Sequence, residues 1–115
     1  MTTTETCPVH LDEGLHRAGD DREFFRELLQ MFAEEASSQV ERLGKAVESG
    51  DLQQVVRIAH CLKGAASNLA AGPVSEAALE LETAARDRGG DEIAPLARRL
   101  EEQLEVLYAF IREFE

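Results

Sequence analysis

Residues 59–71 read AHCLKGAASNLAA, a helix-forming stretch that carries a histidine, a lysine and a glycine within five positions. Neutral histidine has a free nitrogen lone pair near pH 7 and can act as a nucleophile. Lys63 follows His60 by three residues, a spacing that places the two side chains next to each other on a helix. An ammonium group there would offset the charge of incoming phosphoryl oxygens. The spacing therefore indicates nucleophilic phosphoryl chemistry at His60.

Gly64 is the least expected residue of this stretch. Glycine in the middle of a helix costs about 1 kcal/mol relative to alanine, so it persists where a missing side chain is useful. Helical side chains lean toward the N-terminus, so a side chain at position 64 would lie over the turn that carries His60. We interpret Gly64 as clearance for a large reactant. Close packing against a neighbouring helix is the alternative, although Gly64 lies away from the apolar face.

The helical phase predicts that His60 is exposed. At 100° per residue its side chain points roughly 160° from the middle of the apolar arc of this segment. The usual interpretation of an exposed histidine or lysine is a solvated side chain, and the same holds for Ser67, whose hydroxyl is a possible hydrogen-bond donor to the site. The exposed face carries Gln53, Arg57, His60, Lys63, Gly64 and Ser67, and the apolar arc carries Val55, Ile58, Ala59, Leu62, Ala65, Ala66 and Leu69.

Two short patterns elsewhere resemble metal-ligand spacings but are incomplete. Cys7 and His10 form a Cys-x-x-His without a second pair to complete a tetrahedral site. Glu13 and His16 form a Glu-x-x-His, which di-iron bundles use twice together with two further glutamates. We expect no metal site. The two cysteines of the chain are too few for a disulfide scaffold and are expected to be free thiols.

Composition narrows the class of protein. A length of 115 residues with 43% hydrophobic content suits one compact domain. A net charge of -11 argues against nucleic acids and anionic membranes as partners. No segment approaches the ~20 apolar residues of a membrane span, and the N-terminus lacks the layout of a signal peptide. We therefore expect a cytoplasmic protein, and a monomer.

The elements that position these residues are all expected to be helices. No run alternates with the period of a strand, and the three prolines and several glycines fall at helix boundaries. Asp51 with Gln54 resembles a capping box. The expected elements are a disordered segment 1–8, a short helix over 11–18, and longer helices from about 21 to 50, 51 to 71, 72 to 88 and 91 to 112.

Short breaks between amphipathic helices favour antiparallel neighbours, because only that arrangement buries each apolar stripe beside the next one in sequence. The sequence predicts an all-α protein: an up-down-up-down antiparallel four-helix bundle with a short extra N-terminal helix, in a single domain over residues 9–115.

These residues resemble a known family. The pattern Ala59-His60-x-Leu62-Lys63-Gly64, followed by Asn68-Leu69 and by Leu81-Glu82, is similar to the histidine-containing phosphotransfer (HPt) domain of bacterial phosphorelays. The stretch LDEGLHRAGDDREFFRELLQMF is similar to the opening of that family, and the helix plan agrees over residues 9–112. One departure is Ala70, where many members have glycine.

The resemblance implies a domain without kinase activity that shuttles a phosphoryl group between the aspartates of receiver domains, or from a hybrid histidine kinase relay to a response-regulator receiver domain. His60 matches the phosphoacceptor, Lys63 the lysine beside the phosphate and Gly64 the clearance residue. Glu82 matches the residue of the next helix that hydrogen-bonds the other ring nitrogen, and its phase puts it at the edge of the apolar face. The domain would need no cofactor, because the receiver would supply Mg²⁺.

Two other functions remain open at this point. The chain could be a helical adaptor or dimerisation module whose histidine is incidental, or a phosphotransfer-like domain that regulates a kinase without being phosphorylated. For the phosphotransfer function we expect Val56 and Arg57, in the turn before His60, to contribute to receiver docking. Leu79, which lies off the apolar arc of its helix, is a further candidate for this docking patch.

Overall fold

The computed structural model describes residues 9–87 and 90–114, and every regular element in these ranges is helical. The predicted disordered segment 1–8 lies outside the described residues. The helices are α2 (Leu11–Arg17), α3 (Arg22–Ser49), α4 (Leu52–Asn68), α5 (Gly72–Arg86) and α6 (Ile93–Glu113), and a 3₁₀ turn, η1 (Gly90–Glu92), precedes α6. The prediction of an all-α bundle with a short additional helix at its N-terminal end is confirmed.

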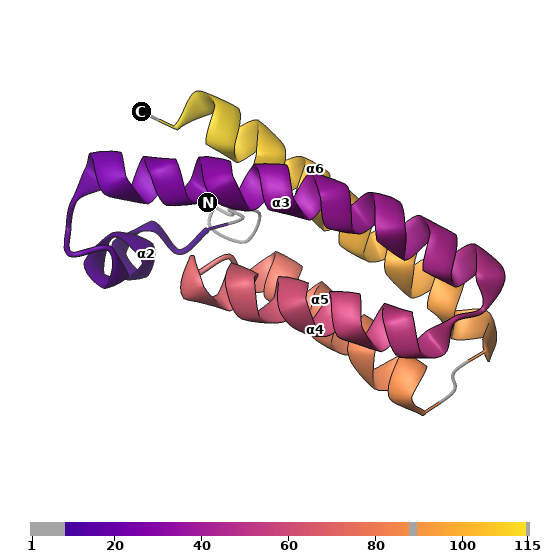
Figure 1. Cartoon of the computed structure of the whole chain (residues 1–115). Helices are drawn as coiled ribbons and strands as arrows, with labels where there is room; N and C mark the ends of the chain where they lie inside the picture. Colours follow the sequence, from indigo (N-terminus) through magenta and orange to yellow (C-terminus); the bar gives the residue numbers. More distant parts are fainter. Residues whose placement is uncertain (1–8, 88–89, 115) are drawn as a thin grey trace, which may run out of the picture.

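The four long helices pack in a ring in which α3 contacts α4, α4 contacts α5, α5 contacts α6 and α6 contacts α3. Figure 1 shows the chain turning back between α3 and α4 and again between α4 and α5, and α2 lies at the end of the bundle where α3 begins. The most extensive helix pairing is that of α4 with α5. The face that carries His60 is therefore built on the two helices that pack most closely.

Local signals in the sequence explain where the helices begin and end. The Asp21 carboxylate accepts a hydrogen bond from the backbone N–H of Phe24 at 3.0 Å, and that of Asp51 accepts one from Gln54 at 3.2 Å. These N-caps satisfy donors that have no partner within the helix. Gly50 ends α3 with a φ of 73°, a left-handed conformation that glycine adopts without strain.

The end of α4 differs from the prediction, which extended this helix to about Ala71. The helix ends at Asn68, and a Schellman motif closes it: the Ala71 N–H donates to Ala66 O at 2.9 Å and the Ala70 N–H to Ser67 O at 3.0 Å. Ala70 takes the left-handed position of this motif with a φ of 58°. A Cβ atom there costs on the order of 1 kcal/mol, which explains why glycine suits this position.

A single apolar core runs the length of the bundle and contains nearly all residues expected from the helical periodicity. Ala65 is an exception: it was expected in the core and is exposed, because it is the outermost member of its arc and its short side chain reaches no neighbouring helix. The largest fully buried side chains are Phe25, Leu29, Leu43, Leu81, Leu100, Leu104, Leu107, Val9, Val55 and Val74. None of the helices in the described ranges is long and apolar enough to cross a membrane.

Candidate functional site

His60 lies on the outer face of α4, and its side chain is 60% exposed. Its immediate sequence neighbour Ala59 is completely buried and Ile58 nearly so, which fixes the rotation of α4 and turns the imidazole outward. The histidine lies at a surface groove of about 520 Å³ that is lined by Leu52, Gln53, Val56, Arg57, His60, Cys61, Ala85 and Arg86. The imidazole is therefore anchored on a buried helix face and is accessible to a large reactant.

Glu82 of α5 lies beneath the imidazole and is buried, with only 5% of its side chain exposed. Its Oε2 is 3.1 Å from His60 Nδ1. The helical phase placed Glu82 at the edge of the apolar face, and the structure places it deeper. The reason is the packing of α4 on α5 through small residues, since Ala59 and Ala66 on α4 and Ala78 and Ala85 on α5 are all buried.

Three cationic or hydrogen-bonding groups surround this buried carboxylate. Arg86 Nη2 lies 2.7 Å from Oε2, Lys63 Nζ lies 3.2 Å from Oε1, and His60 Nδ1 completes the set. The hydrogen bonds from Arg86, and then the Lys63 ammonium group and the hydrogen bond from His60, lower the pKa of Glu82 from its ordinary 4.5 to about 2, although burial acts in the opposite direction. Glu82 is therefore a carboxylate at neutral pH.

The ionised state of Glu82 determines the hydrogen bond that His60 makes. A carboxylate can only accept, so Nδ1 carries the proton and donates it to Oε2. In the neutral ring this leaves the lone pair on Nε2. The arrangement yields a nucleophilic nitrogen without any further base.

Lys63 is half-buried, with 29% of its side chain exposed, and its ammonium group forms an ion pair with Glu82. The sequence predicted that the side chain of Lys63 lies beside that of His60, but it did not predict the ion pair with Glu82. Because Glu82 bonds Lys63 with one oxygen and His60 with the other, it brings the two side chains of α4 to a common point.

Gly64 faces open space. Apart from its two chain neighbours and the backbone of its own helix, a Cβ atom built on it would meet no heavy atom within 4 Å. Close packing against another helix therefore does not explain this glycine, and its role as clearance for His60 stays a prediction.

Arg86 is the member of the cluster that sequence reasoning missed. Its Nε and Nη2 lie 3.2 and 2.7 Å from Glu82 Oε2. The available signal was its position four residues after Glu82, a spacing at which opposite charges meet on a helix. That spacing is common on helix surfaces, so only the burial of Glu82 distinguishes this pair.

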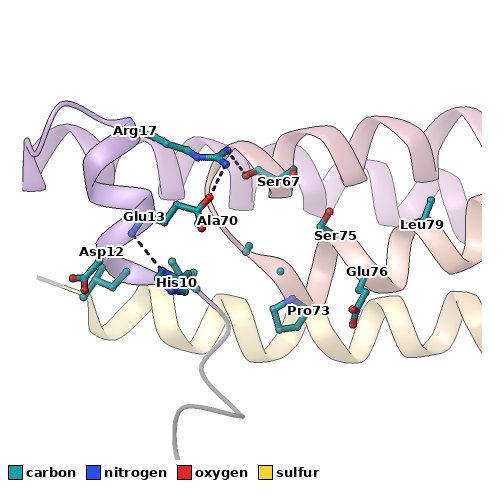
Figure 2. A pocket seen from close by; sticks show the side chains of 14 residues that line it. His10, Asp12, Glu13, Arg17, Ser67, Ala70, Pro73, Ser75, Glu76 and Leu79 are labelled. Atoms are coloured by element: carbon teal, nitrogen blue, oxygen red, sulfur yellow. Dashed lines mark hydrogen bonds and ion pairs between the residues drawn. The ribbon is translucent and has the colours of Figure 1, made fainter.

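Two of the predicted site residues lie elsewhere. Ser67 and Leu79 line a second groove, of about 780 Å³, between α2 and the α4–α5 connection (Figure 2). There the Arg17 guanidinium donates to the Ser67 carbonyl at 2.8 Å and pairs with Glu13, so that it ties α2 to the end of α4. Ser67 and Leu79 do not line the groove of His60, whereas Val56 and Arg57 do.

The short metal-like patterns do not form a site in the described residues, which contain no group of three metal-ligating side chains. Cys7 lies outside those residues. His10 caps α2, and its Nδ1 accepts the Glu13 N–H at 3.4 Å. His16 is exposed, as is the free thiol of Cys61.

A comparison with protein-family models matches residues 27–110 to the Hpt domain. The chain belongs to the Hpt domain family. Hpt domains are the histidine phosphotransfer modules of two-component phosphorelays, so the family resemblance inferred from the sequence is confirmed. No curated protein and no solved structure matches the chain. The match covers α4 and α5 entirely and therefore includes all members of the His60 cluster.

The charge on Glu82 predicts an acid-dependent loss of stability. As pH falls below 4.5 the unfolded chain takes up a proton at this position, whereas the folded protein keeps the carboxylate to a pH of about 2. The contribution of Glu82 is therefore complete above pH 4.5 and declines toward pH 2. In urea melts between these values, Glu82→Gln should flatten the decline in the free energy of unfolding. The exposed Glu102→Gln is the control and should keep the wild-type slope, and an equal slope in both variants would contradict the assignment.

The open space at Gly64 predicts opposite effects on stability and transfer. Gly64→Gln should raise the free energy of unfolding by up to about 1 kcal/mol, because a better helix former enters an unobstructed position. It should slow phosphoryl transfer on the order of 10²-fold, because its side chain leans over His60 and displaces the reactant. Gly44→Gln on α3 is the matched control, because a Cβ there also meets nothing within 4 Å. It should raise the free energy of unfolding in the same way and leave the rate of phosphoryl transfer unchanged. A Gly64→Gln variant that is less stable yet transfers normally would refute the clearance function.

Proposed function

We propose that this protein is a phosphorelay intermediate that accepts a phosphoryl group on His60 and passes it to or from the aspartate of a receiver domain. The observation that carries the proposal is the exposed imidazole whose Nδ1 lies 3.1 Å from the buried carboxylate of Glu82. An incidental surface histidine has no need of a buried, ionised partner. The family match supports the same chemistry.

In the proposed transfer, every bond and proton is accounted for without a cofactor bound to this chain. The Nε2 lone pair attacks phosphorus, an N–P bond forms, and the P–O bond to the donor aspartate breaks, so that the carboxylate leaves with its electron pair. The proton stays on Nδ1, and the ring becomes cationic. Glu82 stabilises that charge through the hydrogen bond it already makes. Return of the phosphoryl group to an aspartate reverses these steps, and the receiver domain supplies Mg²⁺.

Lys63 is the residue that we propose for the phosphoryl oxygens. Its ammonium group lies 3.2 Å from Glu82 Oε1. When Lys63 turns outward, Arg86 still neutralises the same carboxylate, so the movement leaves no unpaired buried charge. Gly64 keeps the approach to Nε2 open, as its surroundings allow. This chain contributes no kinase activity of its own.

We propose that the receiver docks over the groove beside His60. Val56 is half-buried there and offers an apolar contact, and Arg57 and Arg86 offer positive charge to an acidic partner. Leu79, 46% exposed, lines the second groove and would contribute only if the footprint extends along α5. The phosphoryl group would reach this relay from a hybrid histidine kinase, and we propose that the domain acts as a monomer in the cytoplasm.

The first test is transfer from a phosphorylated receiver domain, with the site mapped by mass spectrometry. We expect one phosphoryl group, on His60, in an adduct that is labile in acid and stable in alkali because it is a phosphoramidate. The His60→Gln variant should accept none. If the His60→Gln variant is still phosphorylated, the acceptor is His10 or His16 and the proposal is refuted. If the wild-type protein binds the receiver without accepting a phosphoryl group, the adaptor function is favoured.

The docking groove has its own test. Val56→Asp should fold normally, because the side chain is only half-buried, and should bind the receiver about tenfold more weakly by calorimetry, since a charge enters an apolar contact. Val106→Asp is the control for the added charge, because Val106 is 45% exposed on α6 and lies outside the groove, and urea melts of both variants check that they fold. Equal affinities for Val56→Asp and the wild type would remove Val56 from the docking surface.

A further inference from the structure

Arg86 occupies a particular place in the cluster around His60. Both of its bonding nitrogens, Nε at 3.2 Å and Nη2 at 2.7 Å, lie against the Oε2 atom of Glu82. This is the same oxygen that accepts the His60 Nδ1–H at 3.1 Å. The other oxygen, Oε1, lies 3.2 Å from Lys63 Nζ. The carboxylate is thus held from both sides, by a cation of its own helix and by a cation of α4.

The terminal torsion of a glutamate is broad, so burial alone does not fix which way its oxygens point. Without Arg86, the ion pair with Lys63 would be the strongest interaction left to this carboxylate. Rotation toward Lys63, or protonation of an under-compensated buried acid, would remove the acceptor that faces Nδ1. The imidazole would then lose the interaction that keeps its proton on Nδ1, and its lone pair would no longer be confined to Nε2.

We propose that Arg86 is a positioning residue for His60: it fixes Glu82 Oε2 against Nδ1 and thereby keeps the Nε2 lone pair directed outward. This inference rests on the proposed phosphotransfer function. The hydrogen bonds of Arg86 go to Glu82, and in the described residues no hydrogen bond joins it to the imidazole, so it would act on His60 through Glu82. A transferring His60 would therefore depend on a residue of α5 that does not itself bond the imidazole.

An ordinary surface ion pair is the alternative explanation, and the same helix provides an example. Arg99 of α6 pairs with Glu80 of α5 at 2.6 Å, with 49% and 44% of the two side chains exposed. Exposed pairs of this kind contribute little to stability. The Arg86 side chain is similarly exposed at 58%, but its partner is 5% exposed and also bonds His60. Arg99 is thus a control with matched charge and exposure and no connection to the site.

The experiment compares the wild type with Arg86→Met, Arg86→Lys and Arg99→Met. Methionine keeps much of the apolar stem of arginine and removes the charge, and lysine restores a single cation. The ¹⁵N shifts of the His60 ring report which nitrogen carries the proton, and phosphoramidate, a small phosphodonor, reports the rate of His60 phosphorylation without a receiver. Urea melts of all four proteins monitor folding, and Arg86→Lys provides a second reading if Arg86→Met is destabilised.

We expect Arg86→Met to shift the ring signals away from the Nδ1–H tautomer and to slow phosphorylation about tenfold, by analogy with the loss of the partners that orient metal-binding histidines. Arg86→Lys should be intermediate, and Arg99→Met should match the wild type in both readouts. A wild-type tautomer and rate in Arg86→Met would overturn the inference. A slower rate with unchanged ring signals would also overturn it, because Arg86 would then act on the donor and not on His60.

The same measurements test the proposed function independently of the role of Arg86. If wild-type His60 accepts no phosphoryl group from either phosphoramidate or a receiver, the proposed function fails, and the ring signals alone still decide whether Arg86 positions the imidazole. If the wild type is phosphorylated and Arg86→Met behaves like Arg99→Met, the proposed function stands and the role of Arg86 fails.

Discussion

The ionised carboxylate of Glu82 is the constraint on which the site depends. Within residues 9–87 and 90–114 it is the one charged side chain that is buried. A buried charge is tolerated when it is paired and hydrogen-bonded, and its partners here come from two helices, Lys63 and His60 from α4 and Arg86 from α5. The requirement to compensate one charge therefore fixes how the reactive face of α4 is joined to α5.

The close packing of α4 on α5 makes this compensation possible. Buried alanines on both helices let the backbones approach, and the approach brings a carboxylate on α5 within hydrogen-bonding distance of an imidazole on α4. A larger side chain at Ala59 or Ala78 would separate the helices and lengthen that distance. The apolar core and the polar cluster are thus parts of one arrangement, and the core determines the geometry of the site.

Charge is distributed unevenly over the molecule. The chain has a net charge of -11, yet the groove around His60 contains Arg57 and Arg86, with Lys63 in the next turn of α4. An anionic reactant would be repelled by most of the surface and attracted to this face, which raises the chance of a productive encounter there.

Much of the fold and part of the site were determined by local sequence. The period of apolar residues, the aspartates at positions 21 and 51 and the glycine at position 50 set the helices and their caps, because these effects act over a few neighbouring residues. The same periodicity turned His60 outward and left Gly64 without a packing partner. Such features need no knowledge of what lies on the next helix.

The contacts that decide the chemistry depend on tertiary structure. The depth of Glu82, the resting ion pair of Lys63 and the sharing of one oxygen by His60 and Arg86 all arise from the distance between α4 and α5. Helical phase gives the direction of a side chain but not how far the next helix stands from it, so Glu82 was placed at an edge and Arg86 was missed. Ser67 lies close to the end of α4, where its carbonyl accepts a hydrogen bond from Arg17 of α2, a contact that helical phase does not predict.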